Sequence, residues 1–494
     1  MKKFIFIFSL LAFTAMVSGA KPASLRAYLS HAAFQSPESG PFIETYLSIL
    51  GSSVAYTRND NGKFQGTILV TMLFKQNDSI KEYRKYDLKT AEIEDTTQIN
   101  FIVFDQQRIP LREGKYDLEL QLSDKNREMK PFNANDIIDI TFDNSKISLS
   151  DLELVDSYSK ASETSLLAKS GYDFIPYQDN YYPKNTNKVN FYGEIYNTAA
   201  ILGNESQFVV ASFIQSVETG KPIENFFRLR REIASHVNVV FSEFDISELP
   251  SGNYNLVLSV RDKENKEISS RSVFIQRSNP GIKFNTGSLQ QVMVDNTFAS
   301  LITNADTLRE YIRMGFPVAS ASEKLFINFN VAGGDLKTLQ QFFFNFWVQR
   351  NQANPEGAWK NYFNLVLGVE KEFGSIYKKG YETDRGRVYL QYGSPNQRNV
   401  ETLNPWTFPY EIWHYYTANQ QSNLKFVFYT RDRALNDYTL AHSNALGEVK
   451  NVNWQYEIKR LPAGSKDTDK ELYKQAYDED QFGEHTGDYY NLRR

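Results

Sequence analysis

The sequence predicts a mixed fold in which two tandem β-sandwich domains are followed by an α+β domain. Three observations predict it: short alternating apolar runs fill two stretches, both stretches share one strand-and-turn pattern, and helical spacing begins near Gly281. The chain has 494 residues, of which 41% are hydrophobic. At roughly 150 residues per domain this is enough material for about three packed cores.

The first twenty residues have the pattern of a secretory signal peptide. Two lysines precede an apolar run from Phe4 to Val17, and the small side chains of Ser18 and Ala20 suit a cleavage site. We expect cleavage after Ala20, so that residues 1–20 are lost; a retained membrane anchor is the alternative. The run is short for a bilayer-spanning helix, and no later segment is long and apolar enough. The mature protein is expected to be soluble, without a transmembrane segment.

The charge balance and the lack of cysteine exclude several function classes. Lys and Arg total 55 against 59 Asp and Glu, so the formal net charge is −4 and no cationic excess is available for a phosphate backbone. We therefore expect no nucleic-acid partner. A chain with no cysteine can form neither a disulfide nor a thiolate metal site, and it has no cysteine nucleophile or lipidated N-terminal cysteine. Export without disulfides favours a Gram-negative envelope, in the periplasm or at the outer-membrane periphery.

Residues 21–160 are predicted to form the first β-sandwich. Thr67–Phe74 and Asn100–Phe104 have the alternation of strands. The turn Asp60–Gly62 indicates a hairpin, because Asn-Gly adopts positive φ at low cost. Residues 161–280 are predicted to form the second sandwich. Its candidate strands are Val189–Tyr196, Gln207–Ile214, Val237–Phe241 and Ser270–Ile275.

A shared pattern links the two β-rich stretches. Residues 114–125 (GKYDLELQLSDK) and 252–263 (GNYNLVLSVRDK) both have a Gly-x-Tyr turn, apolar residues at every second position and a closing Asp-Lys. A weaker upstream echo relates Phe64–Ile68 to Phe191–Ile195. We interpret the pattern as two sandwiches of the immunoglobulin-like kind. Convergent use of a common strand-turn sequence is the alternative.

Residues 281–460 are predicted to form the α+β domain. Helical spacing covers Leu301–Met314 and Leu336–Trp347. Asn354 and Pro355 are suited to the N-cap and first position of a further helix. The apolar stripe of that helix is expected to reach Ile376, and a cationic last turn is expected to stop it at Gly380.

Three antiparallel strands are predicted after this helix, at Arg387–Tyr392, Glu411–Tyr416 and Lys425–Thr430. Residues 461–494 have mixed charge and no apolar period, so we expect a mobile polar tail with a short helix near Lys470–Tyr477.

Two segments carry a resemblance to a known family. Gly380–Pro395 (GYETDRGRVYLQYGSP) and Pro409–Trp413 (PYEIW) resemble the GWxTD domain family of secreted bacterial proteins. The resemblance extends from about residue 165 to 455, weakly in the β-rich region and strongly from the Phe-Trp pair at Phe346 to Trp413. The tryptophan of the family motif is Tyr381 here, so an aromatic ring for packing is kept and the indole N–H is absent. The family has no assigned activity.

The motif residues are Gly380, Tyr381, Thr383, Asp384, Arg385, Gly386, Gly393, Pro395, Glu411 and Trp413. We interpret them as an architectural corner. Gly380 would end the helix, the ring of Tyr381 would anchor the turn, and the side chains of Thr383 and Asp384 would accept backbone N–H groups. Gly386 would then permit a sharp entry into a strand.

The alternative is a ligand site. In that case the side chains of Asp384, Arg385, Arg387, Glu411 and Trp413 would converge. With an aromatic floor of Tyr381 and Trp413, Asp384 and Glu411 would be the paired carboxylates of a carbohydrate-binding or glycoside-cleaving domain.

No sequence motif assigns a catalytic residue, a metal or a cofactor. The five histidines, His31, His236, His414, His442 and His485, are too far apart in sequence for a local metal site, and no nucleotide-binding or nucleophile-elbow motif occurs. The expected function is therefore non-catalytic: an exported interaction or assembly module for another envelope protein. The oligomeric state is not predicted.

Overall fold

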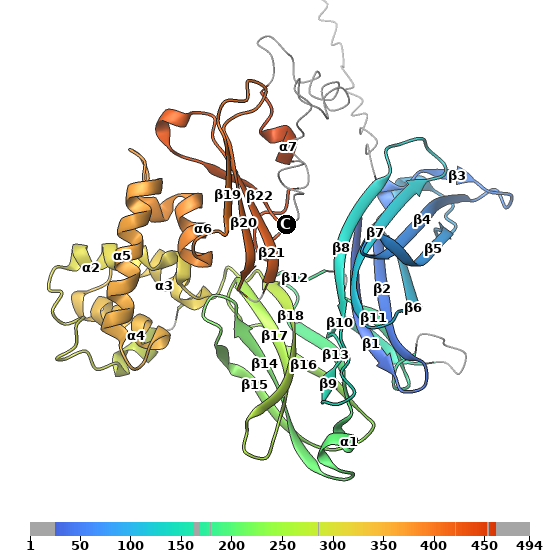
Figure 1. Cartoon of the computed structure of the whole chain (residues 1–494), viewed down its shortest axis with the longest axis horizontal. Coiled ribbons are helices and arrows are strands. Elements are labelled where there is room, and N and C mark those ends of the chain that lie inside the picture. Colours follow the sequence, from blue (N-terminus) through green and yellow to red (C-terminus); the bar gives the residue numbers. More distant parts are fainter. Residues whose placement is uncertain are drawn as a thin grey trace, which may run out of the picture. The chain divides into compact units, whose positions relative to one another are not determined.

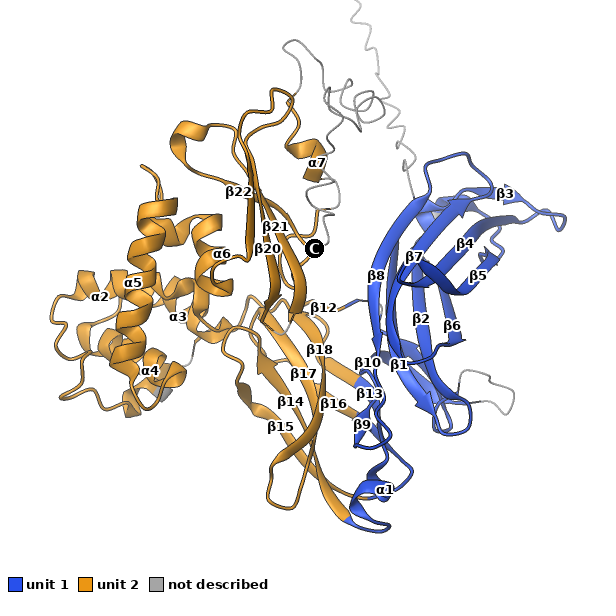
Figure 2. Cartoon of the chain, in the orientation of Figure 1, with its two compact units in different colours: residues 1–179, 191–206, 234–241 blue, residues 180–190, 207–233, 242–494 orange. Residues whose placement is uncertain are grey.

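The computed structural model describes residues 25–161, 168–177, 179–284, 286–419, 421–451 and 454–460, and most of the elements are strands (Figure 1). The expected signal peptide, the tail 461–494 and the helix near Lys470–Tyr477 lie outside the described residues. Two compact units are formed, one from residues 1–179, 191–206 and 234–241 and the other from 180–190, 207–233 and 242–494 (Figure 2). The division passes through the predicted domain 161–280.

The first unit contains three sheets. One has the order β1-β2-β6, from β1 (Ala27–Ser36), β2 (Gly40–Leu50) and β6 (Ile102–Pro110). The next has β3 (Tyr56–Arg58), β4 (Phe64–Gln76), β7 (Gly114–Asp124) and β8 (Phe132–Ile140), with β5 (Ser79–Lys89) paired to β4. The third has the order β11-β10-β13-β16, with β9 (Ser148–Leu149) on β13, from β10 (Glu153–Lys160), β11 (Tyr172–Pro176), β13 (Lys188–Tyr196) and β16 (Val237–Asp245). Short helices η1 (Gly51–Ser53), η2 (Thr96–Gln98) and α1 (Thr198–Leu202) connect strands.

The β1-β2-β6 sheet is buried on both faces, because the alternating side chains of β1 and β2 enter two different cores. Ile43 belongs to a cluster with Val70 and Leu120 of the β4 sheet. Phe34 belongs to a second cluster with Tyr192 of β13. The first unit is therefore built in three layers, with this sheet in the middle.

The second unit combines one large sheet with a helical and sheet region. The large sheet has the order β12-β18-β17-β14-β15, from β12 (Tyr181–Tyr182), β14 (Gln207–Ser216), β15 (Pro222–Ile233), β17 (Gly252–Arg261) and β18 (Glu267–Arg277). The helices are η3 (Thr286–Gln291), α2 (Ala305–Met314), η4 (Phe316–Val318), α3 (Ala321–Phe329), α4 (Leu336–Arg350), α5 (Pro355–Phe373), η5 (Gly380–Glu382), α6 (Asp384–Tyr392), η6 (Arg433–Leu435) and α7 (Trp454–Glu457). The last sheet has the order β19-β20-β21-β22, from β19 (Gln397–Glu401), β20 (Tyr410–Ala418), β21 (Gln421–Tyr429) and β22 (Thr439–Ser443).

The two faces of the last sheet are both covered. Trp413 and Phe426 join the large core formed by α2 to α6. Ile412 and Val427, on the opposite face, pack with Trp454 of α7. An α+β region is thus observed where the sequence predicts one.

Seven strands pair in the same order twice. The orders β1-β2-β6 and β5-β4-β7-β8 recur as β10-β13-β16 and β15-β14-β17-β18. Tyr116 on β7 and Tyr254 on β17 donate equivalent hydrogen bonds, each of 2.9 Å, to the carbonyl oxygens of Arg112 and Pro250 four residues upstream. The predicted repeat at an offset of 138 (252 minus 114) therefore has a structural counterpart.

The predicted correspondence between Phe64–Ile68 and Phe191–Ile195 is wrong, because the two segments lie on strands that are not equivalent in the two repeats. Phe64–Ile68 lies on β4, which pairs with β7, whereas Phe191–Ile195 lies on β13, in a sheet apart from β17. The partner that corresponds to β4 is β14. The Asp60–Gly62 turn is confirmed, because Gly62 has φ of +75° between β3 and β4.

The predicted strand Arg387–Tyr392 is wrong, because these residues belong to helix α6. The alternation of Val388, Leu390 and Tyr392 resembles a strand. However, the Thr383 hydroxyl caps the first helical turn by accepting the N–H of Gly386 at 3.1 Å. Gly393, with φ of +83°, ends this helix.

The ends of two other helices also differ from prediction. Helix α5 begins as expected, with Asn354 accepting the N–H of Gly357 at 2.9 Å, but it ends at Phe373 and leaves Ile376 79% exposed. Gly380 starts η5 and is not a helix stop. Helix α2 begins only at Ala305, because Asn304 accepts the N–H of Thr307 at 2.9 Å.

Candidate functional site

The corner before α6 is held by close backbone contacts. The N–H of Gly380 donates to the Glu370 carboxylate of α5. The Thr383 hydroxyl donates to the Gly380 carbonyl at 2.8 Å and also accepts from Gly386. A Cβ at Gly386 would stand 1.9 Å from the Gly380 carbonyl oxygen, so this position excludes any side chain. Gly386 therefore permits the backbone at Gly380 to approach helix α6 closely. The prediction that Gly386 opens a strand is wrong, because it lies inside this helix.

Tyr381 anchors the corner as predicted for an aromatic residue. Its ring is buried, and its hydroxyl donates to the Glu310 carboxylate of α2 at 3.0 Å. Burial raises the pKa of Tyr381 above its ordinary value, and the negative charge of Glu310 raises it further. The ring and the hydroxyl together connect η5 to α2.

Asp384 joins α6 to the last sheet. It is the first residue of α6, and its carboxylate accepts the N–H of Leu440 on β22 at 2.8 Å. A carboxylate in the first turn also interacts favourably with the positive end of the helix. Its side chain is therefore engaged by backbone, as the corner interpretation predicts.

Glu411 lies at the centre of a buried ionic network. It is 2% exposed, and its Oε1 lies 2.7 Å from Nη1 of Arg385. Its Oε2 accepts from Nε of Arg398 and from the indole N–H of Trp413, both at 2.9 Å. Both carboxylate oxygens therefore have charged or indole donors from the protein itself.

Arg385 is enclosed by aromatic rings and by a loop. Its guanidinium carbon lies 3.9 Å from the ring centre of Tyr438, and Nη2 donates to the Asn436 carbonyl at 2.9 Å. Burial lowers the pKa of Arg385 below its ordinary value, although Glu411 acts in the opposite direction. Arg385 therefore holds α6, β20 and the loop at Asn436 together.

The remaining predicted residues do not converge on Glu411. Arg387 makes a two-point ion pair with Glu448, with both distances 2.8 Å. The Gly393 carbonyl accepts the hydroxyl of Tyr415 at 2.9 Å, and Pro395 lies in the turn between α6 and β19. The structure thus brings together Arg385, Glu411 and Trp413.

Several partners at this corner carry no local sequence signal. They are Glu310, Asn436, Tyr438 and Glu448. Each is distant in sequence from the motif residue that it contacts, so only the fold brings them together. Arg398 has one weak signal, because a strand facing Glu411–Tyr416 needs a cation to pair with a buried glutamate.

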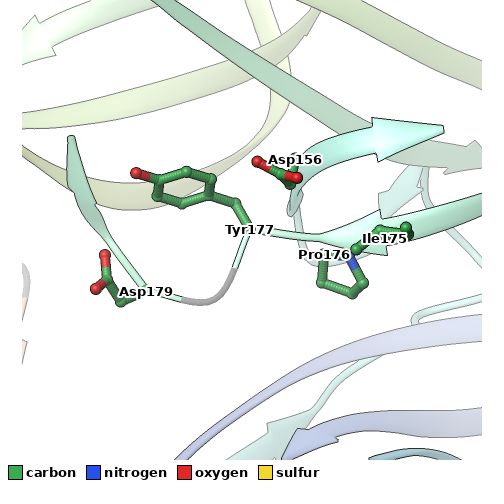
Figure 3. A pocket seen from close by; sticks show the side chains of 5 residues that line it. All are labelled: Asp156, Ile175, Pro176, Tyr177 and Asp179. Atoms are coloured by element: carbon green, nitrogen blue, oxygen red, sulfur yellow. The ribbon is translucent and has the colours of Figure 1, made fainter. Parts of the chain in front are cut away.

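A hollow of about 280 Å³ lies elsewhere, in the first unit. It is lined by Asp156, Ile175, Pro176, Tyr177 and Asp179 (Figure 3). None of the predicted motif residues lines it. This open hollow is therefore separate from the chemistry that the motif suggests.

The geometry favours the corner interpretation over a carbohydrate site. A glycosidase needs two carboxyl groups that reach one substrate bond. Glu411 is buried between Arg385 and Arg398, and Asp384 is bonded to the backbone N–H of Leu440. Among the described residues, no group of three or more histidine and carboxylate side chains is arranged to hold a metal ion. No helix in the described ranges has the length and apolarity to cross a bilayer.

These observations define a β-rich protein with a C-terminal α+β region whose charged corner is internal. Residues 327–460 match the GWxTD domain, so the predicted resemblance is confirmed for this part of the chain. The match covers the corner and its network. The β-rich residues before 327, to which the resemblance extends weakly, lie outside it.

No curated protein matches this chain. Among solved structures, a transglutaminase from red sea bream aligns with 7% identity and a TM-score of 0.17, over 51% of this chain and 31% of the transglutaminase. Fibronectin(III)-like modules of CbhA from Clostridium thermocellum align with 10% identity and a TM-score of 0.14, over 48% of this chain and 85% of the modules. The chain thus spans about a third of the length of the transglutaminase.

Proposed function

We propose that this chain is an exported, non-catalytic envelope protein that serves as an interaction or assembly module for another envelope protein. The observation that carries the proposal is the enclosure of Glu411. Its carboxylate is satisfied by Arg385, Arg398 and Trp413, so neither of its oxygens is free to act as an acid or a base. A site of this kind holds elements of a fold in place and presents their surfaces.

We also infer that the β-rich part consists of two tandem immunoglobulin-like sandwiches. The repeated pairing orders support this inference, since each repeat has a three-stranded and a four-stranded group. The hydrogen bonds of Tyr116 and Tyr254 support it as well, because a tyrosine bonded to backbone a few residues upstream is a feature of such sandwiches. Binding would then occur by apposition of preformed surfaces, a common use of this architecture.

The signal-peptide pattern supports export to the periplasm or the outer-membrane periphery. N-terminal sequencing of the mature protein tests this part of the proposal, and the expected first residue is Lys21. A variant that lacks residues 2–20 is the matched control and should remain inside the cell. An N-terminus at Met1 on protein from the envelope fraction would contradict cleavage.

Crosslinking of the full chain in intact cells tests the interaction. We expect a discrete crosslinked species that contains one envelope protein, absent from cells that carry the chain without residues 2–20. Hydrolysis of envelope polysaccharide by the purified chain, lost in Glu411→Gln at unchanged stability, would overturn the non-catalytic proposal. Absence of any discrete crosslinked partner would overturn the interaction role.

A further inference from the structure

Strand β15 leaves one edge of its sheet open. It pairs with β14 and, within the described residues, with no other strand, and Figure 1 shows it at the margin of the sheet. The outer N–H and C=O groups of an edge strand can pair with a further strand from another chain. The side chains of β15 indicate which kind of strand would fit.

One face of β15 is apolar and exposed. Phe227, Leu229 and Ile233 alternate along it and are 42%, 57% and 59% exposed. The ring of Phe227 stacks on Phe213 of β14, with centroids 5.3 Å apart. Phe213, Ala211 and Val257 form a small buried cluster on this same side, separate from the larger cores. The apolar strip therefore continues from the edge onto β14 and β17.

The other face of β15 is cationic. Arg228 and Arg230 pair across the sheet with Ser212 and Val210, so they project on the side opposite to Leu229. Arg230 contacts Glu232, and Arg228 lies over the ring of Phe244 at 4.9 Å. Arg228 and Arg230 outnumber Glu232 on this face, so its net charge is positive.

The apolar face also carries a cation, Arg231, between Leu229 and Ile233. Arg231 is exposed and forms no ion pair among the described residues. Arg228, Arg230 and Arg231 thus concentrate positive charge on a chain whose formal net charge is −4. A strand added to β15 would place apolar side chains beside Leu229 and acidic ones beside the arginines.

The corresponding strand of the first repeat provides a comparison. Strand β5 is likewise an edge strand, but its outer face carries Tyr83, Lys85 and Asp87, opposite Leu73, Thr71 and Leu69 of β4. Charged outer side chains are how proteins commonly protect an open edge from pairing. The corresponding outer positions of β15 hold Phe227, Leu229 and Arg231, so a leucine in place of a lysine makes this face more apolar than that of β5. Protection of the edge alone does not explain this leucine.

We propose that β15 is the docking strand for an extended segment of a partner protein in which apolar and acidic residues alternate. The proposal rests on the interaction function proposed above and identifies its surface. A second copy of β15 fits less well, because antiparallel pairing of two such strands would bring arginines together. Backbone pairing would supply affinity, and the two faces would supply specificity.

The test uses the full chain and a fluorescent ten-residue peptide of alternating valine and glutamate. We expect it to bind at least about tenfold more tightly than the peptide of alternating valine and lysine. The double variant Arg228→Glu, Arg230→Glu should lose that preference. The matched control on β5, Lys85→Glu, should keep it. N-methylation of alternate peptide bonds should abolish binding if backbone pairing is required.

Three results of the peptide experiment would overturn the proposal. They are equal binding of the two peptides, unchanged binding by the double variant, and equal binding of the N-methylated peptide. Sedimentation of the chain alone must also show no self-association that depends on Arg228 and Arg230, since such association would make a second copy the occupant. If the in-cell crosslinked partner persists in the double variant, the docking strand is wrong while the proposed interaction function stands.

Discussion

Nη1 of Arg385 lies 2.7 Å from Oε1 of Glu411, and both side chains are almost completely buried. Arg385 comes from the first turn of α6 and Glu411 from the start of β20, so this ion pair joins a helix to the sheet. Breaking such a pair leaves a charge that water cannot reach. The contact therefore ties the GWxTD motif to the stability of the domain.

Glu411→Gln should destabilise the protein by about 3 to 5 kcal/mol, because Arg385 and Arg398 lose their shared carboxylate. Urea denaturation followed by tryptophan fluorescence measures the change. Glu356→Gln is the matched control, since Glu356 pairs with Lys360 on an exposed helix surface and its loss should change stability by under about 0.5 kcal/mol. Equal effects of the two variants would contradict a structural role for Glu411.

Gly386→Ala and Gly368→Ala should have opposite effects, although both positions are helical. At Gly386 the new Cβ would meet the Gly380 carbonyl oxygen at 1.9 Å, so we expect a loss of at least about 2 kcal/mol. At Gly368 no atom lies within 4 Å, and alanine should stabilise the helix by about 0.5 to 1 kcal/mol. The melting temperatures of both variants test this prediction. Stabilisation by Gly386→Ala would refute the interpretation of the motif as an architectural corner.

The sequence predicts those parts of the architecture that depend on residues close together in the chain. The N-cap at Asn354 and the turn at Gly62 depend on local chemistry, and both are confirmed. Helix α6 was not predictable from alternation, because Val388 and Leu390 are both buried although they lie two positions apart. A helix enclosed by a sheet and other helices does not show a simple apolar stripe.

The corner residues were predicted to bond within the fold, but the geometry of their contacts was not predicted. Tyr381, Thr383 and Asp384 bind within the fold as expected from their residue types. The contact of Arg385 with Glu411 was predicted, as part of the ligand-site alternative. Its contacts with Tyr438 and Asn436 could not be predicted, since these residues meet Arg385 only through tertiary packing. Local sequence carries no signal for such contacts.

Tyr254→Phe should destabilise the second repeat by about 1 kcal/mol, because the bond to the Pro250 carbonyl is lost while the ring stays buried. Tyr116→Phe should do the same in the first repeat. Tyr158→Phe is the control, since Tyr158 is 52% exposed. Chemical denaturation measures the stability of all three variants. An unchanged denaturation midpoint in both Tyr254→Phe and Tyr116→Phe would argue against equivalent tyrosine hydrogen bonds in the two repeats.

His442 should make stability depend on pH between about 6.5 and 4. Burial lowers the pKa of His442 to about 4, and the charge of Lys450 acts in the same direction. Because the unfolded chain takes up the proton first, stability should fall as pH drops through this window, by at most about 1.4 kcal/mol per pH unit. His442→Asn should remove this part of the slope in urea denaturation, whereas substitution of the exposed His236 should leave it.

A second buried ionic cluster lies in the first unit, where Lys169 contacts two glutamates. Its Nζ lies 2.6 Å from the carboxylate of Glu44 and also bonds to Glu153, and all three side chains are at most 5% exposed. Burial raises the pKa of Glu153 above its ordinary value, and Lys169 offsets this only in part. For Glu44 burial acts in the same direction, but Lys169 and its hydrogen bonds bring the pKa below the ordinary value.

Lys169→Met should therefore leave two buried carboxylates without their shared ammonium, and we expect a loss of about 3 to 5 kcal/mol at pH 7. Without the cation the pKa values of both acids rise in the folded state, so they take up protons and the deficit should shrink as pH falls toward 5. Lys63→Met is the control, because Lys63 pairs with Glu94 at the surface. Urea denaturation at both pH values measures the deficit, and a deficit that grows as pH falls would disprove the ionic account of this cluster.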